Sequence, residues 1–302
     1  MLTIQIIVGP TASGKTALAI KRALAGNGEI ISVDSRQVYK GFVIGTSQPT
    51  GDELARVPHH LVNILDPGER ITAGQYVNLI QGKIAELAEL GKAPVLCGGT
   101  GLYVRALRLG LSKSGAADQQ VRAALLARVE QEGAAAVHAE LVRIDPATAG
   151  RIHPNNIQRL VRALEIYETT GRPPSELREW EGDADEKTPA VPGVGAVQYE
   201  LTGIKWPRDE LYSRINERVS AMLEQGWVAE VEGLLQSGVS RSAHPMQGIG
   251  YRELASVVAG ELPLDEAVPA IQQRTRNFAR RQLTWFRKEP VEWIEAGEIW
   301  DR

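Results

Sequence analysis

The pattern of hydrophobic and polar positions changes regularly along residues 1–110. Segments 2–8, 28–35 and 93–99 are short and mostly apolar, which is typical of strands buried on both faces of a sheet. Segments 15–26 and 77–90 place apolar residues at helical spacing, and Thr72 with Gln75 has capping-box spacing before the second. Strands that alternate with helices predict an α/β fold with a parallel sheet. Ligands of such a sheet bind beyond the carboxyl ends of its strands.

The pattern differs after about residue 114. Segments 118–133, 134–143 and 155–171 read as consecutive helices without a strand between them, and the acidic, Gly- and Pro-rich stretch 181–196 predicts a loop. Segment 197–206 reads as a returning strand, and further helices follow it. We therefore expect an α/β core made of residues 1–114 and 197–302, interrupted by an all-helical insertion domain at residues 115–196.

Composition narrows the class of protein. With 302 residues and 43% hydrophobic content the chain can bury a large core, while its net charge of −3 means that RNA would have to meet a local basic patch. Cys97 is the only cysteine, which excludes an internal disulfide and a thiolate zinc site. The N-terminus lacks a secretory signal pattern and no apolar run is long enough to span a membrane, so we expect a cytoplasmic monomer without membrane contact.

A glycine-rich motif joins the first predicted strand to the first predicted helix. It has the full P-loop pattern, Gly-x-x-x-x-Gly-Lys-Thr, in which backbone N–H groups converge on an anion and Lys15 adds a positive charge. Thr16, or Ser13, can offer a hydroxyl to Mg²⁺. The motif predicts a P-loop NTPase-like core that binds two linked phosphoryl groups, from a nucleotide or from a small organic diphosphate. The expected diphosphate- or nucleotide-binding residues are Gly9, Pro10, Thr11, Ala12, Ser13, Gly14, Lys15 and Thr16.

Asp34 stands at the carboxyl end of the second predicted strand. A strand-end aspartate beside a P-loop can serve Mg²⁺ in phosphoryl transfer, or it can act as a general base in transfer to a weak nucleophile. The residue types alone leave both roles open.

Basic residues gather late in the chain. Segment 271–288 contains six of them and no acidic residue, with aromatic side chains interleaved, which suits RNA backbone contact and base stacking. An amphipathic helix with a solvated basic face would give the same pattern. Arg214 and Arg218 are i, i+4 neighbours and can reach one anion together, while Arg159 and Arg162 share a helical face.

A series of motifs resembles one enzyme family, the tRNA dimethylallyltransferases or tRNA isopentenyltransferases. The resemblance runs from about residue 7 to residue 288, in order and at compatible spacing. The motifs are GPTASGKT, DSRQVYKG, GTSQPT, PHHL, GGTGLY, RIHPNNIQRLVRALE, LYSRINERV, GIGYREL and TRNFARRQLTWFR. The resemblance implies transfer of a dimethylallyl group from dimethylallyl diphosphate to the exocyclic amine of the adenosine 3′ of the tRNA anticodon, with Mg²⁺. It also implies that the insertion domain helps to embrace the anticodon stem-loop.

The resemblance also suggests roles for individual residues. Asp34 would accept the proton of the attacking amine, and Lys15 with the loop amides would stabilise the departing diphosphate. The expected catalytic residues are Asp34, Thr11, Lys15, Arg214 and Arg218. The expected tRNA contacts are Asp34, Ser35, Arg36, Gln37, Thr100, Arg122, Gln158, Arg159, Leu160, Val161, Arg162, Arg280 and Arg281. Gln48, Asn156 and Gly248 depart from the common pattern of the family and receive no role.

Other functions fit part of the sequence. A P-loop kinase of a nucleoside or small metabolite explains residues 1–110 but gives no reason for the basic and aromatic segment. A prenyltransferase that uses free adenine nucleotide would not need that segment either. An RNA-binding protein with an inactive loop is disfavoured because Lys15, Thr16 and Asp34 are all present.

Overall fold

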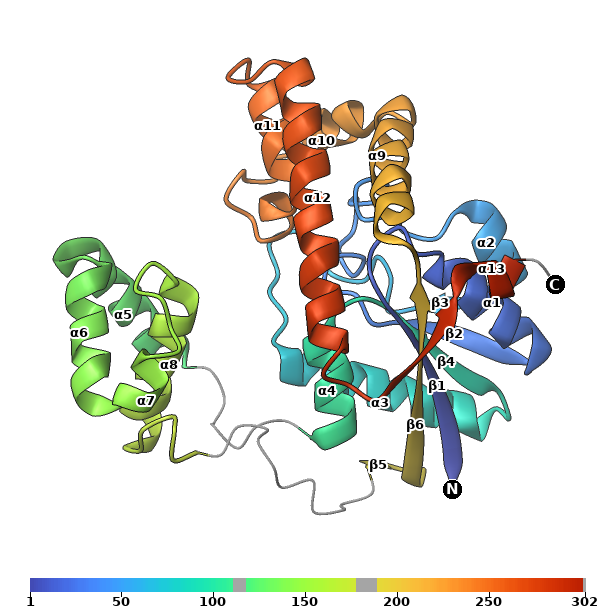
Figure 1. Ribbon diagram of the computed structural model, residues 1–302, viewed down its shortest axis with the longest axis horizontal. Coiled ribbons are helices and arrows are strands. Elements are labelled where there is room, and N and C mark those ends of the chain that lie inside the picture. The colour runs from blue at the N-terminus through green and yellow to red at the C-terminus, as the bar shows by residue number, and fades with distance from the viewer. Residues whose placement is uncertain (111–117, 178–188, 301–302) are drawn as a thin grey trace. The chain divides into compact units, whose positions relative to one another are not determined.

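The computed structural model describes residues 1–110, 118–177 and 189–300. The chain divides into two compact units, which Figure 1 shows as ribbons. The core unit consists of Met1–Arg108 and Thr188–Arg302, and the helical unit consists of Leu109–Lys187.

The core unit is built on a mainly parallel sheet. Its strands are β1 (Leu2–Val8), β2 (Gly28–Ser32), β3 (His59–His60), β4 (Ala93–Cys97), β5 (Ala190–Val191), β6 (Gly195–Lys205) and β7 (Val291–Glu295). The order β3-β2-β4-β1-β6 is parallel throughout; β7 adds to the end of β6 in parallel, and β5 pairs with its start in antiparallel fashion. The predicted α/β fold with a parallel sheet is thus confirmed.

Both faces of this sheet are covered. Side chains that alternate along a strand point to opposite faces, and here both sets are buried. One set packs with α1 (Lys15–Ala25) and α13 (Ala296–Trp300), while α3 (Ala73–Glu89) contacts β2 and β4. The first set is Ile7, Ile30, Val95 and Ile204; the second includes Ile6, Ile31 and Leu96, each fully buried. Burial on two faces explains why these strands read as continuous apolar runs.

The helices of the core unit begin where the sequence supplies caps. The Thr72 hydroxyl accepts from the Gln75 N–H, and the Gln75 side chain accepts from the Thr72 N–H, so the predicted capping box of α3 is confirmed. The remaining helices are α2 (Gly51–Arg56), α4 (Gly101–Leu109), α9 (Arg208–Glu224), α10 (Trp227–Gln236), α11 (Tyr251–Val258) and α12 (Leu264–Phe286), with a short 3₁₀ helix at Pro245–Gln247. In Figure 1 the long helix α12 runs beside α9 and ends near α4.

The helical unit has a small core of its own. Its helices are α5 (Gln119–Glu132), α6 (Ala134–Ile144), α7 (Pro146–Ala149) and α8 (Ile157–Thr170). Asp118 caps α5 by accepting from the N–H groups of Gln120 and Val121. The buried side chains come from all four helices: Leu125, Val129, Val137, Leu141, Ala149, Leu160, Val161, Ala163 and Leu164.

The boundaries of this unit differ from those expected. The expected insertion domain ended at residue 196, but residues 190–191 form β5, which pairs with β6 and so belongs to the core unit. The expected first boundary, residue 114, lies outside the described residues, as does the first half of the predicted loop at 181–196. The helix periodicity carried no signal for a strand as short as β5.

No helix within the described ranges has the length and apolar character needed to cross a membrane.

Candidate active site

The P-loop, residues 9–16, occupies the turn between β1 and α1 (we call it the phosphate loop). Gly9 has a φ of 132° and Gly14 a φ of 92°, conformations that favour glycine. Gly14 caps α1 without any side-chain hydrogen bond, so the first N–H groups of the helix remain available to an anion. The Ser13 hydroxyl is buried and is without a hydrogen-bond partner among the described residues.

Lys15 is folded over the phosphate loop. Its Nζ donates to the Pro10 carbonyl at 2.7 Å. The pKa of Lys15 is lowered to about 8, mainly by burial; nearby Arg218 contributes to the decrease, whereas Cys97 and Asp34 oppose it. The buried amine is therefore a destabilised cation, and an anionic ligand would stabilise its protonated form.

Asp34 follows β2 and is fixed by its own turn. Its Oδ1 accepts from the backbone N–H groups of Arg36 at 2.7 Å and Gln37 at 3.3 Å. Across the described residues no hydrogen bond reaches its other oxygen, Oδ2. The Asp34 charge influences the pKa of both Lys15 and Arg218, so the three groups share one site. The sheet thus brings the predicted loop and the predicted carboxylate together.

The loop after Asp34 is tied to its neighbours through side chains predicted to contact tRNA. The Thr100 hydroxyl accepts from the Ser35 N–H at 3.1 Å, and the Arg36 guanidinium donates to the His244 carbonyl at 2.6 Å. Gln37 accepts from the Ser32 hydroxyl and donates to the carbonyls of Thr46 and Ser47. The Gln37 side chain thus has partners inside the protein while it stays partly exposed, and its assignment as an RNA contact stays a prediction.

Two arginines of α9 reach the same site. Arg214 Nε donates to the Ala12 carbonyl at 3.0 Å, and Arg218 Nε donates to the Ser47 hydroxyl at 3.1 Å. Burial lowers the pKa of Arg218, and Asp34 partly opposes that shift. The i, i+4 spacing correctly placed both arginines on the face of α9 that meets the site.

Sequence reasoning missed two residues that hold the phosphate loop. The Trp206 indole N–H donates to the Ser13 carbonyl at 3.0 Å, and the Arg214 guanidinium lies over the Trp206 ring, 4.2 Å from its centroid. Gln282 accepts from the Thr11 N–H at 2.9 Å and donates to the Gly99 carbonyl at 3.1 Å. Gln282 lies on the buried face of α12, where a polar residue among apolar positions was the available signal.

Some basic side chains of α12 make contacts within the protein, and others are exposed. Arg274 pairs with Glu253 at 2.7 Å, and Arg276 donates to the Asn216 side chain. Arg280 and Arg281 are exposed, and Phe278 beside them is 38% exposed. The segment is thus an amphipathic helix that also presents a basic and aromatic surface.

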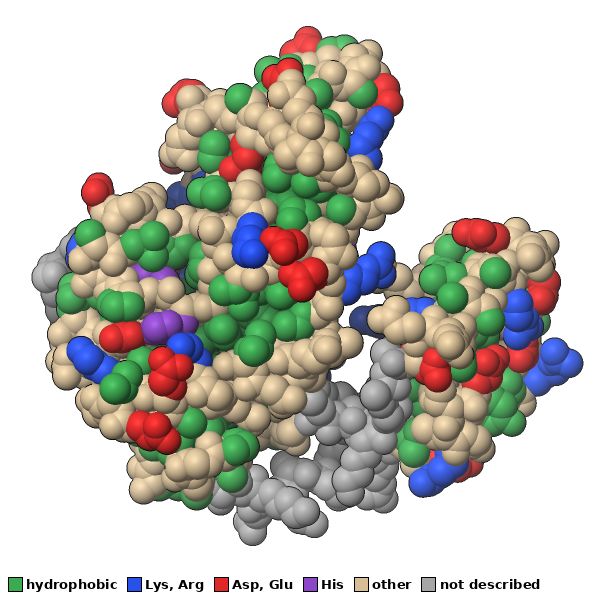
Figure 2. All heavy atoms as spheres, turned by 180° about the vertical axis from the view of Figure 1, so that it is seen from behind, with side chains coloured by type: hydrophobic (Ala, Val, Ile, Leu, Met, Phe, Trp, Pro, Cys, Tyr) green, Lys and Arg blue, Asp and Glu red, His purple; other side chains and the backbone are tan. Residues whose placement is uncertain are grey.

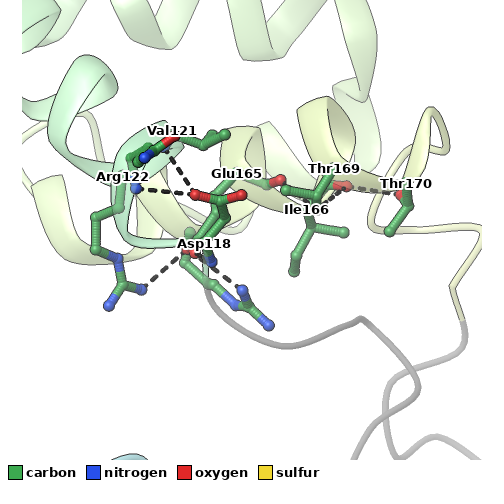
Figure 3. Close-up of polar contacts among 9 residues, drawn as sticks. Asp118, Val121, Arg122, Glu165, Ile166, Thr169 and Thr170 are labelled. Atoms are coloured by element: carbon green, nitrogen blue, oxygen red, sulfur yellow. Dashed lines mark hydrogen bonds and ion pairs between the residues drawn. The ribbon is translucent and has the colours of Figure 1, made fainter.

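Two of the predicted tRNA contacts of the helical unit, Arg122 and Arg162, meet one buried carboxylate, Glu165, whose contact with Arg122 Figure 3 shows. The Glu165 side chain is fully buried, accepts from the Asp118 N–H at 2.8 Å and pairs with Arg122 at 3.0 Å. Arg162 lies 3.3 Å from the same carboxylate. This network joins the start of α5 to the middle of α8.

Two of the predicted contacts in this unit are wrong as side-chain contacts. Leu160 is 0% exposed and Val161 is 2% exposed, and both pack in the core of the unit. Gln158 and Arg159 are exposed. A motif taken as a block includes every residue in it, whereas a helix turns some of them inward.

The residues that depart from the family pattern have structural roles. Gln48 donates to the carbonyls of Gln37 and Tyr39, both at 2.9 Å, and so braces the loop after Asp34. Asn156 caps α8 by accepting from the Arg159 N–H. A Cβ at Gly248 would lie 3.0 Å from the Pro245 carbonyl oxygen, so a larger residue there requires a small shift.

Surface charge gives no broad signal on the face that Figure 2 shows. Lys and Arg side chains are interspersed with Asp and Glu on both units there, and hydrophobic side chains gather on the core unit. This mixture agrees with the net charge of −3. Any RNA footprint therefore depends on local groups such as Arg280 and Arg281.

Comparisons with known proteins show which family this chain resembles. The IPP transferase family model matches residues 37–289. A tRNA dimethylallyltransferase of Geobacter sulfurreducens is 47% identical over 297 residues, 98% of this chain and 93% of that protein. The full-length tRNA isopentenylpyrophosphate transferase of Bacillus halodurans has a TM-score of 0.69 at 38% identity, covering 98% of this chain and 90% of that one.

A structure of a eukaryotic dimethylallyltransferase acting on tRNA has a TM-score of 0.79 at 27% identity, covering 98% of this chain and 74% of that one. The predicted family resemblance is thus confirmed over nearly the whole chain, and with it the P-loop-like fold. The chain belongs to the IPP transferase family.

Proposed function

We propose that this protein transfers a dimethylallyl group from dimethylallyl diphosphate to the exocyclic amine of the adenosine 3′ of the anticodon in tRNA. Family membership supports a prenyltransferase that acts on tRNA. Family membership also favours the allylic donor, and one observation about the site supports a diphosphate as its leaving group. Lys15 and Arg214 donate to carbonyls of the phosphate loop, and Arg218 donates to the Ser47 hydroxyl. No carboxylate of the described residues pairs with any of the three. Cations held in this way, close to a helix N-terminus, suit a diphosphate.

The acceptor side of the reaction rests on Asp34. The amine nitrogen attacks the allylic carbon, the carbon–oxygen bond to the diphosphate breaks, and the amine proton passes to the Asp34 carboxylate. Adenine's exocyclic amine is a weak nucleophile, so removal of its proton by a fixed base assists the attack. The turn that holds Oδ1 leaves Oδ2 as the oxygen that takes the proton.

The donor side rests on the phosphate loop. Negative charge grows on the diphosphate as it departs, and Lys15, Arg218 and the free amides at the start of α1 stabilise it. Arg214, whose Nε binds the Ala12 carbonyl, joins them and also fixes the loop. We also propose that Thr11, a residue of the phosphate loop, lies against the leaving diphosphate.

The loop also suits Mg²⁺. No group of three His, Cys, Asp or Glu side chains that could hold a metal is found in the residues described. Mg²⁺ typically takes few protein ligands when a substrate supplies phosphate oxygens, and the buried, unpartnered Ser13 hydroxyl together with Thr16 fits that requirement. When bound, the ion would neutralise charge on the diphosphate. We propose these two hydroxyls as its protein ligands.

The tRNA contacts are proposed for each unit separately. In the core unit, Ser35, Arg36 and Thr100 border Asp34, and Arg280 with Arg281 offers exposed charge to the RNA backbone. In the helical unit the exposed or half-exposed candidates are Arg122, Gln158, Arg159 and Arg162. The target base must leave its stack to reach Asp34, which is the usual requirement for chemistry on a base.

A label-transfer assay tests this function. The protein is incubated with Mg²⁺, labelled dimethylallyl diphosphate and bulk tRNA, and label is counted in the RNA. A parallel reaction replaces the allylic diphosphate with γ-labelled ATP. Label from the allylic donor in tRNA is expected; label from ATP in a small acceptor, with none in tRNA, would instead identify the P-loop kinase.

A further inference from the structure

Gln282 is a buried polar side chain that the proposed reaction has not used. It is 6% exposed and projects from the last turns of α12. Both ends of its side-chain amide form hydrogen bonds: Oε1 accepts from the Thr11 N–H, and Nε2 donates to the Gly99 carbonyl. A single side chain thus joins the phosphate loop to the glycine-rich loop after β4, residues 98–101.

The glycine-rich loop leaves room for this bridge. A Cβ at Gly99 would lie 2.1 Å from Gln282 Nε2, so any larger residue there would push the amide away. A Cβ at Gly98 would lie 2.1 Å from the Val33 carbonyl oxygen, and one at Gly101 would lie 2.2 Å from the Trp285 ring. Close approach of the end of β2 and of α12 therefore explains these glycines.

The bridge connects the two halves of the proposed chemistry. Thr11 belongs to the loop that carries Lys15. Thr100, next to Gly99, accepts from the N–H of Ser35, the neighbour of Asp34. The distance between the diphosphate and the carboxylate therefore depends on the spacing of these loops, which Gln282 spans.

We propose that Gln282 is a positioning residue that holds the phosphate loop and the Asp34 side of the site at the spacing that transfer requires. This inference rests on the proposed function. Gln282 acts on backbone atoms and not on substrate. Its loss leaves a partly buried N–H and a buried carbonyl without these partners, which the loops relieve by moving. A shift of the order of 1 Å in reacting groups is enough to slow an enzyme severely.

The test compares Gln282→Met with Gln273→Met, the same substitution at an exposed glutamine of the same helix. Binding of inorganic diphosphate with Mg²⁺ is measured by calorimetry, tRNA binding by filter retention, and transfer by steady-state kinetics. We expect Gln282→Met to weaken diphosphate binding and raise the KM for dimethylallyl diphosphate about tenfold, with a lower kcat. The tRNA Kd should stay within about twofold of the parent, as a residue that touches no RNA requires.

Gly99→Ala should disrupt the Gln282 bridge in a second way. It keeps Gln282 but displaces its amide, so it should reproduce the tenfold loss without removing a side chain. Because both substitutions break one bridge, the double variant should be no weaker than about tenfold, whereas independent effects would multiply to about a hundredfold.

Three results would overturn the inference: unchanged diphosphate binding in Gln282→Met, a defect confined to tRNA binding, or multiplicative effects in the double variant. Failure of the proposed function is seen separately, in the parent protein. A parent that binds diphosphate but places no label in tRNA would refute the proposed function, and the calorimetric comparison would still test the bridge.

Discussion

The core unit and the helical unit treat buried charge in opposite ways. Around the phosphate loop, Lys15 and Arg218 are half-buried at a cost to their protonated forms, and their partners are a carbonyl and a hydroxyl. In the helical unit, Arg122 and Arg162 meet the buried Glu165. The cations of the first case thus lack an ion-pair partner at contact distance, whereas those of the second share a buried carboxylate.

This difference separates a binding site from a scaffold. Unpaired cations in a partly buried site raise the free energy of the empty protein and are relieved by an anion. A carboxylate that gathers arginines and a helix-end N–H instead fixes the relative placement of α5 and α8 (Figure 3). The core unit should therefore respond to substitutions through ligand binding and rate, and the helical unit through its own stability.

Substitution of Asp34 should have the largest effect on the core unit. Asp34→Ala removes the proposed base, and we expect transfer to fall by about 100-fold or more, with tRNA binding nearly unchanged. Single-turnover transfer and filter binding measure the two quantities. Asp52→Ala, at an exposed position of α2, is the matched control. Transfer by Asp34→Ala at the parental rate would show that the base lies elsewhere.

Loss of Glu165 should affect the helical unit alone. Glu165→Ala leaves two arginines and the Asp118 N–H without this carboxylate. Because the arginines are partly exposed, we expect the stability of the helical unit to fall by about 2 kcal/mol. Amide hydrogen exchange should accelerate about 30-fold within residues 119–170. Exchange in α1 and α3 and binding of inorganic diphosphate should not change.

The control for this prediction is Glu168→Ala, an exposed glutamate of the same helix. It should leave exchange at the parental rate throughout. Equal acceleration in both units of Glu165→Ala would contradict the independence of the two units.

The sequence revealed the parts of the site that are local and missed those made by distant residues. A strand, a glycine-rich turn and a helix follow one another within segment 2–26, and Asp34 ends the next apolar run, so both could be located from pattern alone. Gln282 is 271 positions from Thr11 and Trp206 is 193 positions from Ser13, so no periodicity links them.

Helical geometry set a different limit. The assignment of Gln158 to Arg162 as RNA contacts treated consecutive residues alike, although successive residues of a helix point about 100° apart. Leu160 and Val161 fill the core that the other helices require. The short strand β5 escaped prediction because two residues carry no alternation to detect.

Titration of Lys15 should make diphosphate binding by the core unit depend on pH. Its pKa of about 8 in the free protein means that the cation is lost as pH rises from 7 to 9, so its contribution to binding should fall about tenfold. The measurement is the ratio of Kd values for Lys15→Ala and the parent, which cancels the titration of the ligand itself. The ratio should be largest at pH 7.

The same shift predicts how the free protein responds. A lowered pKa means that the unfolded chain binds more protons between pH 8 and 10.5, so the contribution of Lys15 to stability should increase across that interval. Lys15→Ala should lack this increase. A Kd ratio independent of pH would show that Lys15 does not titrate in the free site.

The smallest effect concerns the outer face of α12. Arg280→Ala combined with Arg281→Ala should weaken tRNA binding severalfold and make the log–log salt dependence shallower by about 1 to 2, since each arginine that meets a phosphate releases about one counterion. The control pair, Arg22→Ala with Arg56→Ala, removes equal charge from exposed sites on α1 and α2. A general effect of net charge would change the salt-dependence slope of both double variants equally. A change in slope confined to the α12 pair therefore locates the RNA contact there.

Diphosphate binding should be unchanged in both double variants, because Gln282, one residue beyond Arg281, faces inward while the arginines face solvent. An equal slope for the α12 pair and the control would show that the RNA does not contact this face of α12.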